Sequence, residues 1–245
     1  MDKTADILNS NLSNQISRLS ITDSLHLFTE LYPGQVSFST SFSLEDQVIL
    51  HHIVTESLPV TIFTLDTGRL FGETYAVWTA TREKYSVPIH PYIPNVSLLE
   101  TYVNQKGPNA FYESIENRKA CCFIRKVEPL KRALAGQKVW VTGIRAEHSD
   151  NRSQLNLLEW DEGNQLNKYN PLLHWKQEEI RNYISENEVP YNILHDRGFV
   201  SIGCQPCTRA IRPGEEFRAG RWWWEEADKK ECGLHENTLT KNTEV

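Results

Sequence analysis

Hydrophobic residues along this chain alternate between strand and helix spacing. Short apolar and β-branched runs predict strands at residues 36–39, 60–65, 89–93 and 138–143, with a weaker pair at 155–160 and 166–169. Apolar residues at helical spacing predict one or two helices in the first thirty residues, and others at about 48–53, 71–85, 123–134 and 176–187. Because strands and helices alternate, we expect an α/β fold with a parallel sheet flanked by helices.

Polar residues follow three of these strands where each strand ends. They form the serine loop Ser39–Ser43, the turn Asp66–Arg69 and the segment Gly143–Arg145. Ligands of open α/β sheets bind at the carboxyl ends of the strands, and the helix N-terminus after the serine loop would favour an anion. Serines in front of a helix also serve only as helix caps. Three strands that end in polar residues at one edge of the sheet nevertheless favour a binding site. The loop is neither G-x-x-x-x-G-K-S/T nor GxGxxG, which disfavours a Walker ATPase and a Rossmann dehydrogenase.

Composition narrows the class of protein. The 245 residues carry 26 Lys and Arg against 32 Asp and Glu, a formal net charge of −6, which disfavours a nucleic-acid-binding protein. No run approaches the roughly 18 apolar residues of a membrane helix, and the N-terminus lacks the plan of a signal peptide. An odd number of cysteines, five, fits poorly with a disulfide framework. We therefore expect a cytoplasmic protein without a membrane or nucleic-acid partner.

Four of the five cysteines form two pairs. Cys204 and Cys207, in a CxxC loop, are within reach of one metal, whereas adjacent Cys121 and Cys122 both face one centre only if it is larger than a single ion. Together the pairs favour a [4Fe–4S] cluster over zinc. The alternatives are a redox dithiol or zinc knuckle for the CxxC loop and two unrelated buried thiols for the adjacent pair. Cys232 follows two lysines, which would favour its reactive thiolate form; the alternative is an ordinary exposed cysteine.

Six segments together resemble one enzyme family. They are Ser39–Asp46, Leu65–Arg69, Cys121–Leu130, Gly203–Arg209, Arg218–Trp224 and Glu231–His235. In these segments the chain is similar to the assimilatory adenylyl-sulfate (APS) reductases, the iron–sulfur type of the sulfonucleotide reductase family. The two cysteine pairs with the terminal ECGLH are the specific part of the match, and the resemblance accounts for all five cysteines.

The resemblance implies an adenine-nucleotide α-hydrolase-like fold with a modified pyrophosphatase loop. Ser41–Asp46 stands where ATP pyrophosphatases carry SGGxDS, and the loss of both glycines disfavours ATP cleavage. It also implies an N-terminal helical segment (1–30), a nucleotide-binding α/β domain (31–200) and a C-terminal segment with the CxxC loop, an arginine loop and a catalytic-cysteine tail (201–245).

The resemblance also implies roles for individual residues. Cys121, Cys122, Cys204 and Cys207 would ligate one [4Fe–4S] cluster per subunit. Lys126 would lie near both cluster and sulfate, Arg218 and Arg221 would grip the phosphosulfate, and Cys232 would be the nucleophile. The further substrate-binding candidates are Ser39, Ser41, Phe42, Ser43, Leu65, Asp66, Thr67, Gly68, Arg69, Gly143 and Arg145. Whether His235 acts as a base for Cys232 stays open. The other histidines, His195 among them, and Trp222–Trp224 are expected to be structural.

The expected reaction reduces APS to sulfite and AMP, in sulfate assimilation and cysteine biosynthesis. The Cys232 thiolate attacks sulfur and AMP leaves, which gives an S-sulfocysteine. Reduced thioredoxin or a similar dithiol then releases sulfite, because the chain has no spare cysteine for this step. The cluster is expected to act electrostatically and structurally rather than as an electron carrier.

Three alternatives remain at this stage. The first is a reductase of 3′-phosphoadenylyl sulfate (PAPS), or of both nucleotides. The second is a tRNA-thiolating enzyme, which would need ATP and a basic RNA-binding face. The third is a non-enzymatic iron–sulfur sensor, which would not need Cys232. The sequence carries no interface signature, so a homo-oligomer also stays open.

Overall fold

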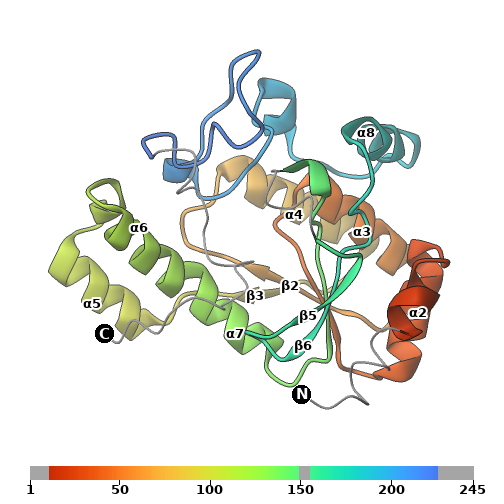
Figure 1. Cartoon of the computed structure of the whole chain (residues 1–245). Helices are drawn as coiled ribbons and strands as arrows, with labels where there is room; N and C mark the ends of the chain where they lie inside the picture. Colours follow the sequence, from red (N-terminus) through yellow and green to blue (C-terminus); the bar gives the residue numbers. More distant parts are fainter. Residues whose placement is uncertain (1–10, 149–154, 226–245) are drawn as a thin grey trace.

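The computed structural model describes residues 11–148 and 155–225, and it contains one six-stranded sheet (Figure 1). The order β3-β2-β1-β4-β6-β5 applies to strands β1 Val36–Ser39, β2 Thr61–Leu65, β3 His90–Tyr92, β4 Val139–Val141, β5 Leu158–Asp161 and β6 Leu166–Tyr169. β1 pairs in parallel with β2 and with β4, and the pairs β2–β3 and β4–β6 are parallel as well. Only the edge strand β5 is antiparallel, to β6. The predicted α/β class with a mostly parallel sheet is confirmed.

Helices cover both faces of the sheet (Figure 1). One face packs against α2 Ile21–Leu31, α3 Leu44–Thr55, α4 Gly72–Tyr85 and α8 Gln177–Glu186. The other face packs against α7 Glu128–Leu134, beyond which lie α5 Val96–Lys106 and α6 Ile115–Cys122. The central strands are buried on both faces, and their side chains alternate between the two: Phe38 and Val141 face the larger core, while Phe63 and Trp140 face α7.

The order of the strands produces a switch point beside β1. The chain moves outward from β1 to β2 and β3 with α3 and α4 on one face, then returns to β4 on the opposite side of β1 through α7 on the other face. In doubly wound sheets, the crevice at such a point is where ligands bind. The site is therefore expected between the carboxyl ends of β1 and β4. Within the described residues, no helix is long and apolar enough to cross a membrane.

Candidate active site

A cavity of about 220 Å³ lies at the switch point between β1 and β4. Its walls come from the ends of β1, β2 and β4, from the short helix η5 (Ile193–Arg197) and from the chain between residues 200 and 222. The predicted site residues that line it are Ser39, Ser41, Ser43, Leu65, Thr67, Lys126, Gly143, Arg218 and Arg221. The structure thus brings three strand ends together with the C-terminal arginine loop.

The serine loop makes a tight turn in which Phe42 adopts a left-handed φ of 60°. Side chains other than glycine rarely occupy this region, so neighbouring structure must hold the turn. The Phe42 ring does so: it is buried and stacks on Trp78, with 5.5 Å between the ring centroids. The Phe42 ring faces the core rather than the cavity, so this predicted substrate-binding residue holds the turn instead.

Asp46 engages the donors of the serine loop. Its carboxylate accepts hydrogen bonds from the Ser41 N–H and the Ser41 hydroxyl, both at 2.6 Å, and its own N–H donates to Ser43 Oγ at 3.2 Å. Burial raises the pKa of Asp46 to about 6, although the bonds from Ser41 act in the opposite direction. The serine loop is therefore both the cap of α3 and a wall of the cavity.

Gly143 lies against this carboxylate at the end of β4. A Cβ added to Gly143 would collide with Asp46 Oδ1 and would lie 3.2 Å from Glu45 Cβ. We expect Gly143→Ala to displace Asp46 and the serine loop, and to weaken AMP binding about tenfold, measured by calorimetry. Gly72→Ala is the matched control, since nothing lies within 4 Å of its added Cβ. Equal affinities of the two variants would contradict this role for Gly143.

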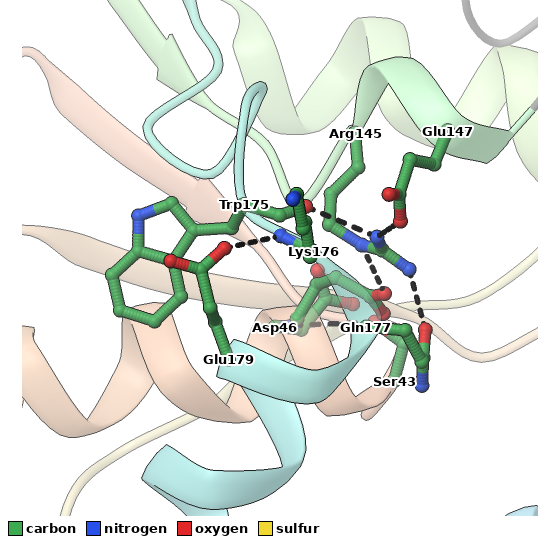
Figure 2. A network of polar contacts seen from close by, with 9 residues as sticks. Ser43, Asp46, Arg145, Glu147, Trp175, Lys176, Gln177 and Glu179 are labelled. Carbon is green, nitrogen blue, oxygen red and sulfur yellow. Dashed lines mark hydrogen bonds and ion pairs between the residues drawn. The ribbon is translucent and has the colours of Figure 1, made fainter.

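Arg145 does not line the cavity, although the sequence places it among the substrate-binding candidates. Its buried guanidinium donates to Glu45 Oε1 at 2.8 Å, Glu147 Oε2 at 2.6 Å, Gln177 Oε1 at 2.5 Å and the Trp175 carbonyl at 3.1 Å. Figure 2 shows this side chain reaching from the end of β4 toward the start of α8. Because these protein groups pair with its charge and accept its N–H donors, Arg145 holds Glu45 and α8 in position.

The turn after β2 connects the cavity to a second one. Asp66 Oδ1 accepts from the Gly68 N–H at 2.9 Å and from the Tyr75 hydroxyl at 2.8 Å, so Asp66 shapes its own turn. Thr67 lines the first cavity, and its hydroxyl accepts from Cys204 Sγ at 3.3 Å. Arg69 lines the second cavity, with its guanidinium 5.0 Å from the centroid of the Phe111 ring.

All four paired cysteines line this second cavity. Cys121 and Cys122 end α6, Cys204 precedes the short helix η6 (Gln205–Cys207), and Cys207 ends it. All four are buried, and none of them forms a disulfide within the described residues. The chain continues from Cys122 into a π-helical turn, η2 (Phe123–Val127), a wider helical turn that is often found at functional sites.

The surroundings of the four thiols fit an anionic multi-atom group. Within residues 11–148 and 155–225, no three ligands are placed to hold a single metal ion. Three buried N–H groups on residues that line the cavity, Arg125 Nε, Arg221 Nε and Trp222 Nε1, have no hydrogen-bond partner among the described residues. Buried N–H groups that lack an acceptor and lie beside four thiols fit an iron–sulfur cluster, because the sulfur atoms of such a cluster accept hydrogen bonds. Burial raises the pKa of the Cys207 thiol to about 12, so a metal would have to favour the thiolate.

Arg118 fixes the rear wall of this second cavity. Its fully buried guanidinium donates to both carboxylate oxygens of Glu225, at 2.9 and 2.7 Å, and lies 4.9 Å from the Trp222 ring centroid. A buried ion pair of this geometry is strongly destabilised when one partner is removed. The pair therefore anchors the chain that leads towards residue 226.

Lys126, Arg221 and Trp222 line both cavities and so form the wall between them. The guanidinium groups of Arg218 and Arg221 lie 5.7 and 4.8 Å from the Trp222 ring centroid. Gly203 makes room for Arg221, because an added Cβ would collide with that guanidinium. Positive charge is thus concentrated at the end of the first cavity that borders the cysteines. Cys232 and His235 lie outside the described residues.

Residues 35–210 match the model of the phosphoadenosine phosphosulfate reductase domain. The chain belongs to this reductase family. An adenosine 5′-phosphosulfate reductase of Burkholderia cepacia is 47% identical over 97% of this chain and 94% of its own length. One of Allochromatium vinosum is 51% identical over 82% of this chain and 78% of its own length.

Solved structures support the same placement. A phosphoadenylyl-sulfate reductase from Candida auris has a TM-score of 0.71 and 30% identity over 83% of this chain and 96% of that chain. An FMN adenylyltransferase from Candida glabrata has a TM-score of 0.52 at 18% identity, over 98% of this chain and 86% of that chain. This likeness concerns the fold alone, and it confirms the expected adenine-nucleotide α-hydrolase-like architecture.

Several residues of this reductase site carry no signal in the sequence. His195, Thr142, Ser201, Ile202 and Phe217 line the first cavity but belong to no charged or cysteine motif. His195 in particular was expected to be structural. The segment at 193–203 lies far in sequence from the strand ends, so only the folded chain shows that it closes the cavity.

Proposed function

We propose that this reductase converts APS to sulfite and AMP with electrons from reduced thioredoxin or a similar dithiol, in the cytoplasm, for sulfate assimilation. The observation that carries this proposal is the wall shared by the two cavities. Lys126 and Arg221 stand between a cavity at the nucleotide switch point and a cavity lined by four cysteines. The relatives named adenosine 5′-phosphosulfate reductase support the choice of APS. We assign nucleotide binding to residues 31–200, and the CxxC loop and nucleophile to 201–245.

The second cavity is proposed to hold one [4Fe–4S] cluster, ligated by Cys121, Cys122, Cys204 and Cys207. When bound, the cluster would tie η6 to the end of α6 and thereby fix the wall between the cavities. Arg125, Arg221 and Trp222 line this cavity, and each carries a buried N–H group with no acceptor among residues 11–148 and 155–225. No electron needs to pass through the cluster in the reaction below.

The cationic residues Lys126, Arg218 and Arg221 are proposed to bind the phosphosulfate. The sulfur of APS is surrounded by negative oxygens that repel a thiolate, and positive groups offset this repulsion. The Cys232 thiolate attacks the sulfur, a sulfur–sulfur bond forms, and the sulfur–oxygen bond breaks with its electron pair leaving on AMP. The product on the enzyme is S-sulfocysteine at Cys232.

The second half of the reaction consumes the dithiol. One thioredoxin thiolate attacks Cys232 Sγ, and sulfite leaves with the electron pair of the sulfur–sulfur bond. The second thioredoxin thiolate then attacks the thioredoxin sulfur of the mixed disulfide and regenerates the Cys232 thiolate. Sulfur is reduced by two electrons from sulfate to sulfite level, and the dithiol becomes a disulfide.

A substitution of Arg221 tests the first step, the attack of Cys232 on the sulfur of APS. We expect Arg221→Leu to lower kcat/KM for APS by about 10²-fold, because one cationic contact to the transition state is lost. Arg209→Leu is the matched control: Arg209 pairs with Glu215 in the same segment and does not line either cavity. Steady-state kinetics with equal iron content in both variants measure the effect. A loss that is the same in both variants would contradict a direct role for Arg221.

PAPS reduction, alone or beside APS, is the second candidate function. It is favoured by the likeness to the Candida auris phosphoadenylyl-sulfate reductase. The deciding experiment measures sulfite release from APS and from PAPS by anaerobically purified protein with reduced thioredoxin. We expect APS to be turned over in preference. Equal rates would assign dual specificity, and sulfite from neither nucleotide, with the iron content intact, would refute the reductase proposal.

A further inference from the structure

His195 is held rigidly in the wall of the nucleotide cavity. It belongs to η5, which Asn192 caps by accepting from the Leu194 N–H at 3.1 Å. The Asn192 amide also donates to the Thr74 hydroxyl at 3.1 Å, which joins η5 to the start of α4. Only 6% of the His195 surface is exposed, and its side chain lines the cavity. The ring is therefore positioned before any ligand binds.

One ring nitrogen of His195 has no partner. The ring is hydrogen-bonded to the Phe199 backbone, whereas Nε2 is buried with no partner among the described residues. Burial lowers the pKa of His195, although the Phe199 bond and the Glu45 carboxylate act in the opposite direction. A neutral imidazole whose Nδ1 donates to the backbone carries a bare lone pair on Nε2. Such a buried acceptor is costly unless a donor reaches it.

Two carboxylates line the same cavity as His195. They belong to Glu45, whose charge acts on His195, and to Asp46, whereas the Arg181 guanidinium contacts His195 only at its carbonyl, at 3.4 Å. The Arg145 guanidinium that pairs with Glu45 is also bonded to Glu147 and Gln177. The wall that this cavity shares with the second one is cationic, because Lys126 and Arg221 line both cavities. Glu45, Asp46 and His195 line only the first cavity, away from that wall. A ligand with an anionic end and a donor-bearing end fits this polarity in one direction only.

We propose that His195 Nε2 accepts a hydrogen bond from a ribose hydroxyl of the bound nucleotide, which makes His195 a specificity-determining residue. With the phosphosulfate at the cationic end, the ribose hydroxyls are the donors nearest to the phosphate, and they face Glu45, Asp46 and His195. A phosphate in place of a ribose hydroxyl would place an anion next to these three hydrogen-bond acceptors. This role of His195 rests on the proposed nucleotide site. It narrows the ligand of that site from an adenine nucleotide to one whose ribose hydroxyls are free.

The test is equilibrium binding of nucleotides to the full chain by calorimetry, which does not depend on turnover. The probes are AMP, 2′-deoxy-AMP, 3′-deoxy-AMP, inosine 5′-monophosphate and adenosine 3′,5′-bisphosphate. The protein is expected to bind one deoxy nucleotide about tenfold more weakly than AMP, and the bisphosphate more weakly still. Inosine monophosphate, which lacks the 6-amino donor, should bind as AMP does.

Variants at position 195 assign the effect to this side chain. His195→Phe should weaken the binding of AMP about tenfold. It should not change the affinity for the deoxy nucleotide that the wild-type protein binds more weakly, because the substitution and the missing hydroxyl remove the same hydrogen bond. His195→Gln, which keeps an acceptor, should bind AMP within about threefold of wild type. His26→Phe is the control, since His26 is exposed on α2. If His195→Phe does not fold, the His195→Gln protein must still discriminate against the deoxy nucleotide.

Three results would overturn the inference. An equal loss for AMP and both deoxy nucleotides in His195→Phe would indicate packing rather than a hydrogen bond. Weak binding of inosine monophosphate with full binding of the deoxy nucleotides would assign the contact to the adenine amino group. No binding of AMP to the wild-type protein would refute the nucleotide site itself, and the role of His195 with it.

Discussion

A Cys232→Ser protein is expected to release no sulfite from APS, with a rate at least about 10³-fold below wild type. A serine hydroxyl is a far weaker nucleophile than a thiolate, and an O-sulfo product would have no sulfur–sulfur bond for a dithiol to cleave. The measurement is sulfite release from APS with reduced thioredoxin under anaerobic conditions.

The same variant supplies its own control for folding and for the nucleotide site. Because Cys232 belongs to neither cysteine pair, Cys232→Ser should keep the iron content of wild type and should bind AMP with the same affinity. An active Cys232→Ser protein would place the nucleophile elsewhere and would favour an iron–sulfur protein whose function does not need the terminal cysteine.

A Cys207→Ser protein is expected to lose most of its iron, from about four atoms per chain to less than one, together with its brown colour. The Cys207 thiol is buried beside Trp222 in the second cavity, so the loss of a ligand there also frees η6 from α6. We expect Tm to fall by about 5 °C or more, since cluster binding contributes to folding.

Cys232→Ser is the matched comparison for this second prediction, because it makes the same chemical change at the cysteine that belongs to neither pair. Iron analysis, visible absorption and thermal unfolding are measured on both proteins after anaerobic purification. Full iron content in Cys207→Ser would mean that the CxxC loop is not a ligand, and a zinc or dithiol role for that loop would then have to be considered. Equal Tm values would show that the cluster does not join η6 to α6.

The fold was predictable because its helices and strands carry their own patterns. The strand at Leu166–Tyr169 has the predicted bounds, and the strands β1, β2 and β4 fall within the predicted runs. The side chains of β2 and β4 are buried on both faces, which produces continuous apolar and β-branched runs in the sequence. The helices α5 and α6 were not predicted. Among the residues of α5 only Tyr102 is buried, so the sequence shows no apolar stripe at helical spacing.

The candidate site was predictable where its chemistry is unusual and not where it depends on tertiary contacts. Paired cysteines and an arginine loop are rare enough to stand out in a sequence. Arg145 shows the limit: a guanidinium at a strand end suggests anion binding, but its donors bond to Glu45 and Gln177 from other segments and to the neighbouring Glu147. His195 shows the reverse, because the role proposed for it rests on its burial beside Glu45, which nothing in the sequence indicates.

Mass spectrometry tests the proposed S-sulfocysteine at Cys232. The full-length, iron-loaded protein is incubated with APS in the absence of any dithiol, then digested and analysed. We expect one added SO₃ on the peptide that contains Cys232, formed with one equivalent of AMP and released as sulfite when reduced thioredoxin is added. An unmodified Cys232 in protein that makes sulfite from APS, or an adduct on another residue, would contradict it.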